Sequence, residues 1–308
     1  MPITSLPIAE LVTGTYLGTF ANTDPMWHEL RSQGIGGSEV GTIAGLNQWE
    51  SAYTLWAKKC DLISADIPKS EAMEAGTRLE KVIIEWFADE MPELQIDPNV
   101  GTWAGSLGWD HANPDALYVD ADGECGVIEI KTARFEDNWI VPAKGVAGSV
   151  DGVPQHYATQ VQWYLRVLGL ESAWLVVLFG GQKLRWYRIE ANHYQQDVDL
   201  AMATQMMECI QTVKSPAWDG SSSTYETVRV MHPDITDDVV DLPSDLGNEY
   251  LVAVTNQKQI DAHLLELKSQ ILDFMGSAKA ARINGEIRCV RQAGRNGAAP
   301  FLVNKESK

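Results

Sequence analysis

The pair of motifs Pro114-Asp115 and Glu129-Ile130-Lys131 constrains the fold of this chain more than any other feature of its sequence. Thirteen residues separate the aspartate from the glutamate. Side chains alternate between the two faces of a strand, so Glu129 and Lys131 point the same way while Ile130 points into a core. The second motif therefore predicts a strand with one charged face and one apolar face.

The intervening residues carry the signature of a β-hairpin. Residues 116–119 read as one strand, Asp122-Gly123 as its turn and residues 126–128 as the returning strand. Folding at that turn brings Asp115 back opposite Glu129, within one residue of register. Two carboxylates and the ammonium group of Lys131 then meet at one edge of a sheet.

Such a cluster suits metal chemistry. Carboxylate oxygens are the hard ligands that Mg²⁺ and Mn²⁺ prefer, and a lysine beside them can hold or activate a water molecule. The combination is suited to metal-assisted hydrolysis of a phosphodiester. An ordinary Asp-Gly hairpin with a glutamate and a lysine on its polar face has the same appearance, so both interpretations stay open at this point.

The composition is that of a globular protein without a membrane segment. The chain has 308 residues, of which 45% are hydrophobic and 21% are charged. Its longest apolar run, residues 173–179, is too short to span a bilayer, and its N-terminus shows no signal peptide. We therefore expect a cytoplasmic protein. The four cysteines, Cys60, Cys125, Cys209 and Cys289, are widely scattered along the chain. They lack the paired spacing that is typical of a zinc site, an iron–sulfur cluster or a disulfide framework.

The formal charge of −18 is unusual for a protein that binds nucleic acid, because phosphate binding normally shows a basic footprint. The charge is unevenly distributed. Residues 277–308 hold seven basic residues against two acidic ones, whereas residues 190–249 hold twelve carboxylates against two basic residues. An acidic exterior with a local basic lining is compatible with DNA binding and discourages non-specific association. Charge alone favours neither interpretation.

Periodicity and turn residues predict the other elements. Helices are expected at about residues 26–33, 39–45, 51–60, 71–90, 154–169 and 191–214, and strands near residues 94–96, 100–104, 115–120, 126–132, 173–179 and 183–189. This order predicts an α/β fold with a central mixed sheet flanked by helices. Three parts are expected along the chain: a core with an irregular N-terminal arm (1–214, the arm being 1–25), an acidic linker (215–248), and a long helix with a basic tail (249–308).

Two helices offer polar side chains to such a site. Glu80 borders the apolar stripe of the helix at 71–90, although a surface carboxylate whose stem packs on the core is the simpler interpretation. Gln160 and Tyr164 lie four residues apart and share a helix face.

The glycine-rich segment 34–38 precedes a further helix, and Ser38 is suited to cap it. A helix N-terminus attracts an anion such as phosphate. The simpler alternatives are that Ser38 only caps the helix and that Arg31 is a surface charge.

Taken together, these segments resemble a known family. Asp115 with Glu129-Ile130-Lys131 has the form of the PD-(D/E)XK nuclease signature. Arg31 with residues 34–39, and residues 74–80, resemble motifs of the YqaJ viral recombinase group, to which the phage lambda exonuclease belongs. Residues 160–164 resemble the Q-x-x-x-Y helix of many such nucleases. The resemblance implies a PD-(D/E)XK (restriction endonuclease-like) core followed by a C-terminal helical extension.

The resemblance implies a catalytic role for five residues, namely Glu80, Asp115, Glu129, Lys131 and Gln160. Asp115, Glu129 and the main-chain carbonyl of Ile130 would bind a metal ion, which would be Mg²⁺ with Mn²⁺ as a substitute. Lys131 would position or deprotonate the attacking water. Glu80 would bind a second metal ion, directly or through water. The implied reaction is two-metal hydrolysis of a phosphodiester.

The resemblance also implies contacts with the substrate. Gln160 would steady Lys131 or the scissile nucleotide, with Tyr164 in support. Arg31 and Ser38 would hold the 5′-terminal phosphate of the digested strand, and Asn113 would touch the same phosphate. Neighbouring Asp110 and His111 receive no role, and His111 is better explained as a hydrogen-bonded loop residue than as a metal ligand.

The activity that the resemblance implies is a 5′–3′ exonuclease that degrades one strand of linear double-stranded DNA. The 3′ overhangs left behind would serve phage homologous recombination in the cytoplasm of a bacterial host. The implied partners are DNA ends, two further copies in a homotrimer, and a single-strand annealing protein. Two alternatives stay open: a related nuclease of other polarity or an endonuclease, and a non-catalytic DNA-end-binding or scaffold protein.

Overall fold

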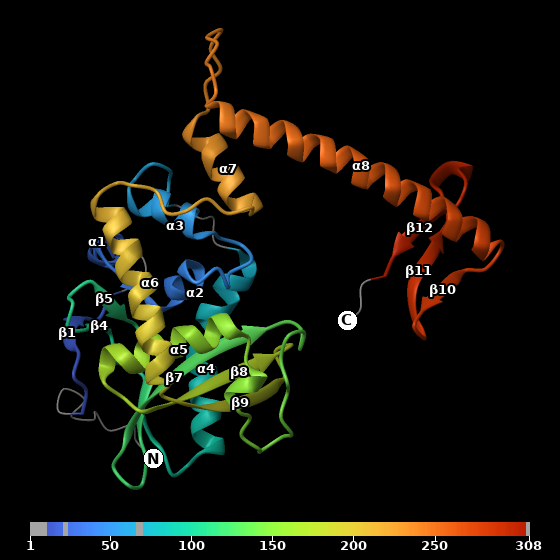
Figure 1. Ribbon diagram of the computed structural model, residues 1–308. Coiled ribbons are helices and arrows are strands. Elements are labelled where there is room, and N and C mark those ends of the chain that lie inside the picture. Colours follow the sequence, from blue (N-terminus) through green and yellow to red (C-terminus); the bar gives the residue numbers. More distant parts are fainter. Residues whose placement is uncertain (1–10, 21–23, 66–69, 306–308) are drawn as a thin grey trace. The chain divides into compact units, whose positions relative to one another are not determined.

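The computed structural model describes residues 11–20, 24–65 and 70–305, and it divides the chain into two units, residues 1–234 and 235–308 (Figure 1). Residues 1–10 and 21–23 of the predicted arm, and the last three residues of the basic tail, lie outside the described residues. The boundary between the units falls inside the stretch predicted to be a linker.

A five-stranded mixed sheet forms the centre of the larger unit, in the order β3-β6-β7-β8-β9. Its strands are β3 (Gln95–Asp97), β6 (Ala116–Val119), β7 (Cys125–Ala133), β8 (Ser172–Phe179) and β9 (Lys183–Glu190). Only β7 and β8 are parallel neighbours. Helix α5 (Gln155–Leu168) connects them, as a parallel pair requires. The predicted α/β fold with a mixed sheet is confirmed.

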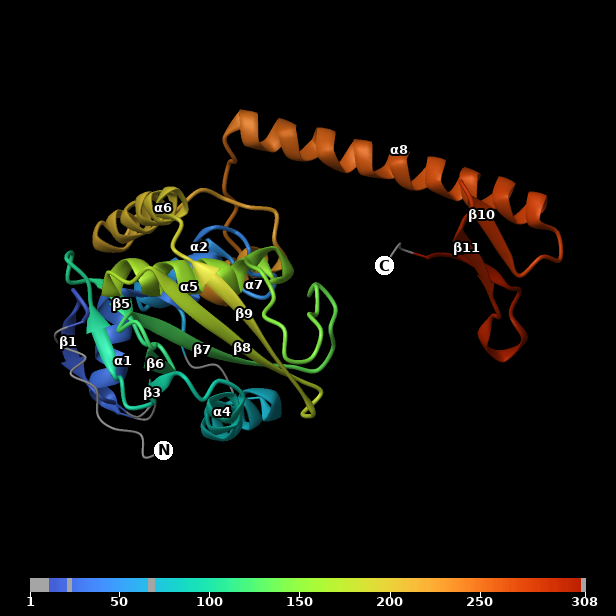
Figure 2. The same ribbon diagram turned by 90° about the horizontal axis from the view of Figure 1, so that it is seen from below.

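Helices cover both faces of this sheet (Figure 2). On one face, helix α4 (Glu71–Glu90) buries Ile83 and Phe87 against Ile128 and Ile130 of β7. On the other face, α5 packs over the alternate residues of the same strands in a second cluster. Strand β8 is buried along its whole length because it is covered from both sides, which explains its continuous apolar sequence.

The larger unit also contains a second, four-stranded sheet with the strand order β1-β4-β5-β2. Its strands are β1 (Thr15–Gly18), β2 (Ile35–Gly36), β4 (Thr102–Ala104) and β5 (Asp110–Ala112). The prediction that residues 1–25 are irregular is wrong for β1, which pairs with β4. Strands of two to four residues are too short to show a hydrophobic period, so the sequence gives little sign of this sheet.

Among the residues that the structure describes, five further α-helices belong to the larger unit. They are α1 (Pro25–Gln33), α2 (Gly37–Ile43), α3 (Ala52–Lys59), α6 (His193–Gln211) and α7 (Ser222–Met231). Helix α7 corrects the prediction of a continuous linker. Thr54 of α3 hydrogen-bonds to Ser223 and Thr227 of α7, each at 2.7 Å, and this buried contact ties α7 to the core.

The smaller unit consists of helix α8 (Ser244–Met275) and a three-stranded antiparallel sheet. The strands are β10 (Ala280–Ile283), β11 (Glu286–Gln292) and β12 (Phe301–Asn304). The long helix and a strand at residues 287–290 are predicted from the sequence, whereas β10 and β12 are not. A small cluster of Met275, Cys289 and Leu302 joins the sheet to the end of α8. In the described parts of the chain, no helix has the length and apolar character needed to cross a membrane.

Candidate active site

The hairpin predicted from the sequence forms as strands β6 and β7. Ala116 pairs with Ile128, and this register places Asp115 opposite Glu129, as predicted. Gly123 in the turn has a φ angle of +85°, a conformation that glycine adopts without strain. A local turn and a two-residue period are therefore sufficient to bring the two carboxylates together.

The charged side chains of the hairpin converge on the face covered by α5. The Lys131 Nζ atom donates a hydrogen bond to Glu129 Oε1 at 2.5 Å. Asp115 Oδ2 accepts a hydrogen bond of 2.7 Å from the backbone N–H of Ile130. The side chain of Glu129 is only 4% exposed, so this ion pair lies in a largely dry environment.

Helix α5 contributes an amide that joins this cluster. Gln160 Nε2 donates to Glu129 Oε1 at 2.7 Å and to Tyr164 Oη at 3.0 Å. The shared helix face of Gln160 and Tyr164 is confirmed, and the group that Gln160 contacts is Glu129. The second carboxylate oxygen, Glu129 Oε2, is buried and has no hydrogen-bond partner in the part of the chain that the structure describes.

The pKa values of the cluster reflect buried carboxyl groups packed together. Burial and the nearby Asp115 carboxylate together raise the pKa of Glu129 to about 8, against the opposing effect of Lys131. Burial also raises the pKa of Asp115. Burial lowers the pKa of Lys131, but the charges of Glu129 and Asp115 outweigh it and the net shift is upward. Lys131 is therefore a cation held between two acids.

Glu80 approaches from α4, the helix on the opposite face of the sheet. Burial and the Asp115 carboxylate together raise its pKa to about 7, against the opposing effect of Lys131. One turn earlier, a Cβ atom on Gly76 would lie 3.4 Å from Thr132 Oγ1, so α4 runs close to β7 here. Glu80 is therefore near enough to the hairpin cluster to feel its charges.

These residues fit a divalent cation by their chemistry. Among the described residues, no three His, Cys, Asp or Glu side chains already lie as a compact metal-binding group. The donor set is nevertheless all oxygen, its carboxyl groups have raised pKa values, and one buried oxygen of Glu129 lacks a partner. Positive charge at this position would satisfy that oxygen and lower all three pKa values.

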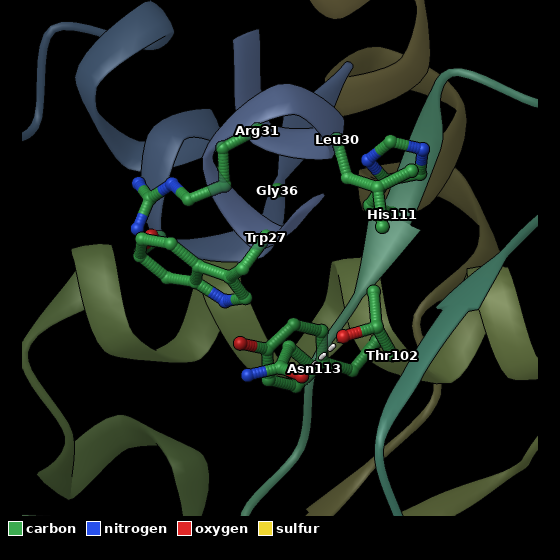
Figure 3. A pocket seen from close by; sticks show the side chains of 10 residues that line it. Trp27, Leu30, Arg31, Gly36, Thr102, His111 and Asn113 are labelled. Carbon is green, nitrogen blue, oxygen red and sulfur yellow. Dashed lines mark hydrogen bonds between the residues drawn. The ribbon is translucent and has the colours of Figure 1, made fainter. Parts of the chain in front are cut away.

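A pocket of about 100 Å³ has Tyr164 among its lining residues, and Figure 3 shows several of the side chains around it. That volume exceeds the space needed by one water molecule several-fold, which suits a phosphate-sized group. The predicted phosphate-binding residues Arg31, Ser38 and Asn113 all line it. The remaining lining residues are Trp27, Leu30, Gly36, Gly37, Thr102, His111 and Tyr164. Tyr164 thus belongs to this pocket and, through Gln160, to the carboxylate cluster.

The start of α2 forms one wall of the pocket. The prediction that Ser38 caps the helix is wrong, because α2 begins at Gly37 and its N-cap is Gly36. Ser38 is the second helical residue, and its side chain lines the pocket instead. A Cβ atom on Gly37 would lie 2.6 Å from Tyr164 Cε1, so only glycine permits this close approach of α2 to α5.

Two residues that the sequence does not identify hold Arg31 and the glycine-rich segment. Glu39 Oε1 lies 3.1 Å from the Arg31 guanidinium, and Glu39 Oε2 lies 2.9 Å from Lys59 Nζ. Lys59 also donates to the carbonyl of Gly34 at 2.7 Å and to that of Arg31. Burial raises the pKa of Glu39, but Lys59 and Arg31 outweigh it and the net shift is downward. Glu39 therefore stays ionised and orients Arg31, whose guanidinium lies 4.9 Å from the Trp27 ring centre.

The unexplained pair Asp110 and His111 has structural partners. Asp110 is fully buried and forms an ion pair of 2.9 Å with Arg166. His111 lies on strand β5 rather than in a loop, and its Nε2 atom is 3.1 Å from the Gly108 carbonyl. Burial lowers the pKa of His111. The predicted hydrogen bond is confirmed, and the imidazole also lines the pocket.

The first turn of α5 supplies two further neighbours of Lys131. Its Nζ atom lies 5.1 Å from the ring centre of Tyr157, a cation–π contact. The ring of His156 lies 3.9 Å from that of Tyr157, and its Nε2 atom is buried without a hydrogen-bond partner among the described residues. Neither residue belongs to a motif that the sequence reveals.

Comparison with known proteins identifies relatives of this chain. Residues 26–171 match the family described as YqaJ-like viral recombinase domain, and all of the predicted site residues lie inside this match. The protein YqaJ of Bacillus subtilis (strain 168) is 27% identical over 283 residues, which cover 85% of this chain and 82% of that protein. Protein D345L of African swine fever virus (strain Badajoz 1971 Vero-adapted) is 28% identical over 155 residues, covering 44% of this chain and 43% of that protein.

One solved structure with a related arrangement is that of an alkaline exonuclease, LHK-Exo, from Laribacter hongkongensis. It is 17% identical, and the match covers 62% of this chain and 94% of that protein with a TM-score of 0.47.

Proposed function

We propose, starting from the fact that this chain carries a YqaJ-like viral recombinase domain over residues 26–171, that it is a metal-dependent nuclease of phage recombination. The domain match confirms the family that the motifs predict. In the proposed reaction the protein degrades the 5′-ended strand of linear double-stranded DNA in the 5′–3′ direction. The product is a duplex with 3′ single-stranded overhangs.

The buried and partnerless Oε2 atom of Glu129 is the observation that carries this proposal. A buried carboxylate oxygen without a partner is unfavourable, and it is retained where a ligand uses it. Asp115, Glu129 and the carbonyl of Ile130 would hold one Mg²⁺ or Mn²⁺ ion, and Glu80 would help to hold a second. When bound, the ions would supply Lewis acidity at the scissile phosphate and a lowered pKa of bound water.

The side chains around this centre have separate tasks in the proposed reaction. Lys131, held between Glu129 and Asp115, stays protonated and orients the attacking water. Gln160 fixes the Glu129 carboxylate by donating to Oε1, which leaves Oε2 for the cation. The cation–π contact with Tyr157 restricts Lys131 to this side of the sheet. Each task follows from a contact that the folded chain already makes.

The proposed polarity rests on the position of the pocket. Arg31, Ser38 and Asn113 surround a space of phosphate size, and Glu39 with Lys59 holds Arg31 at its edge. Tyr164, which lines this space, accepts a hydrogen bond from Gln160, and Gln160 also donates to Glu129. A strand whose 5′-terminal phosphate occupies the pocket would therefore present its first phosphodiester to the carboxylate cluster.

Assembly and partners also belong to the proposal. The family description concerns viral recombination, and a nuclease that leaves 3′ overhangs needs a single-strand annealing protein to use them. A homotrimer that encircles DNA and a location in the cytoplasm of the bacterial host complete the expectation carried by the family resemblance.

Labelled linear duplexes test this function directly. The protein is incubated with duplexes that carry a 5′-phosphate or a 5′-hydroxyl, in Mg²⁺ or in EDTA, with each strand labelled separately. The proposal expects loss of the 5′-phosphorylated strand only, and only in Mg²⁺. Cleavage of closed circular DNA would identify an endonuclease instead, loss of the 3′-ended strand would reverse the polarity, and binding of ends without cleavage in any metal would identify a scaffold.

A further inference from the structure

Helix α8 carries a stripe of apolar residues with a strict seven-residue repeat. Counting along the helix, the stripe recurs at alternating steps of four and three residues, at Leu246, Tyr250, Ala253, Gln257, Ile260, Leu264, Leu267, Ile271 and Phe274. Eight of these nine positions are apolar, and the exception is Gln257. This is the pattern of the a and d positions of a coiled coil, sustained over four heptads.

Most of this stripe has no cover within its own unit. The small sheet packs against the last turns of α8 only, where Ile271, Leu272 and Met275 meet Cys289 and Leu302 (Figure 2). In the preceding turns of the helix, the side chains of the stripe are exposed to solvent: Leu246 is 56% exposed, Tyr250 64%, Ile260 66%, Leu264 41% and Leu267 39%. A contiguous apolar strip of this kind marks an interaction surface.

The period of the stripe indicates what kind of surface it meets. A straight α-helix drifts by about 20° per heptad relative to a seven-residue repeat, which amounts to about 80° over four heptads. A flat partner surface would therefore lose contact with one end of the stripe. A second helix that supercoils with α8 keeps contact along the whole length, and strict heptads serve this geometry.

No other described helix of comparable length is available in the same chain. The next longest helices, α4, α6 and α5, already bury apolar side chains in the core of the larger unit. A second copy of α8 has the same length and the same stripe. When two copies lie parallel and in register, Gln257 faces Gln257 and their amides can pair, whereas a shift by one heptad would set one Gln257 against Leu264 and the other against Tyr250.

We propose that α8 pairs in parallel with the α8 of a second copy of this chain, forming a coiled coil through residues 246–274. The proposal is independent of the proposed catalytic function, and the pairing is a contact separate from those of the homotrimer expected from the family resemblance.

The molar mass of the full-length protein in solution tests whether the apolar stripe of α8 mediates self-association. The variant Leu264→Glu/Leu267→Glu places four negative charges in the seam of each pair while keeping strong helix formers in α8. Its matched control is Leu251→Glu/Leu265→Glu, which changes two leucines that are 62% and 66% exposed and lie outside the stripe. We expect the first variant to weaken self-association by about 100-fold or more, and the control to behave as the wild type. A wild type that is monomeric at tens of micromolar overturns the proposal.

If the larger units also associate, the molar mass alone does not show whether α8 takes part, and cysteine cross-linking then tests the α8 contact directly. Ala253→Cys places a thiol in the seam, where two copies bring their Cβ atoms within disulfide range. Thr255→Cys places one on the outer side of the same helical turn. Under mild oxidation we expect covalent dimers from Ala253→Cys well above the background of the native cysteines, and none from Thr255→Cys. Equal yields from the two variants, or no dimer from either, would show that α8 meets something other than its own copy.

Discussion

Gln160 donates a hydrogen bond of 2.7 Å to Glu129 and thereby connects helix α5 to the charged strand β7. The same amide nitrogen also donates to Tyr164, which forms part of the phosphate-sized pocket. One side chain therefore links the pocket to the carboxylate cluster. In the proposed nuclease, a change at Gln160 disturbs the metal site before it disturbs the fold.

Replacement of Gln160 tests that link. Gln160→Ala leaves Glu129 without its amide donor, and partners of this kind typically contribute 10–100-fold in metal affinity. We expect the Mg²⁺ concentration for half-maximal cleavage to rise by about that factor, while saturating Mg²⁺ restores much of the rate. The matched control is Gln162→Ala, since Gln162 is equally buried but contacts the Glu190 carbonyl. A similar Mg²⁺ shift in both variants would reduce the role of Gln160 to packing.

Lys131 separates cleavage from DNA binding. Lys131→Ala removes the cation that holds the attacking water in the proposed reaction, a contribution of about 100- to 10,000-fold for such a group. We expect single-turnover cleavage to fall by that amount while the affinity for duplex ends, measured by fluorescence anisotropy in Ca²⁺, changes little. Parallel loss of both would assign Lys131 to binding rather than to chemistry.

Arg31 reports on recognition of the 5′ end. Its guanidinium is held at the pocket edge by Glu39. We expect Arg31→Ala to reduce the ratio of cleavage rates for 5′-phosphate and 5′-hydroxyl duplexes by about tenfold or more, since a charge-assisted hydrogen bond contributes about 1.5–3 kcal/mol. Arg229→Ala, which changes an exposed arginine paired with Glu226 on α7, is the control. If the ratio in Arg31→Ala stays at the wild-type value, the phosphate lies elsewhere.

The buried carboxyl group of Asp199 is expected to make the free energy of unfolding depend on pH, and this effect is unrelated to catalysis. Burial raises its pKa to about 6, and its Oδ2 atom is buried without a hydrogen-bond partner among the described residues. The unfolded value is about 3.9. At a pH between these two pKa values, Asp199 binds a proton in the folded protein but not in the unfolded chain. The free energy of unfolding therefore falls as the pH rises from about 4 to 6. Above pH 6 the folded protein carries the whole cost of burying the ionised carboxylate.

Asp199→Asn removes this penalty while keeping the acceptor for Gln195. We expect the free energy of unfolding to increase by about 1 kcal/mol at pH 7.5, after allowance for solvent screening, and the gain to shrink as pH approaches 4. Urea unfolding across this range measures it. The exposed neighbour Asp197 provides the control variant Asp197→Asn. A gain that is constant across pH would trace to helix propensity instead.

The sequence predicts those parts of the site that depend on local pattern. Asp115 and Glu129 meet because an Asp-Gly turn and a two-residue period specify the hairpin without help from the rest of the chain. Gln160 and Tyr164 meet because four residues make about one helical turn. The carboxylate cluster was therefore accessible from the sequence down to individual residues.

Other parts depend on contacts between distant segments and could not be predicted in this way. Lys59 ends helix α3 as an ordinary cation, and only the fold places it beside Glu39 and the Gly34 carbonyl. Strand β1 is four residues long and owes its conformation to β4, far along the chain. Ser38 looked like a cap because its residue type favours that position, yet the backbone of Gly36 takes it. In each case a tertiary partner overrides a local preference.

The wall formed by Tyr164 and Gln160 has a consequence for the size of the product. Gly37 presses α2 against Tyr164 with no room for a Cβ atom, so this wall cannot become thinner or thicker without rebuilding two helices. In the proposed nuclease, the distance from a captured chain end to the bond that breaks is thus a fixed dimension of the protein. Such a molecule acts as a ruler that measures the same step at every advance along the strand.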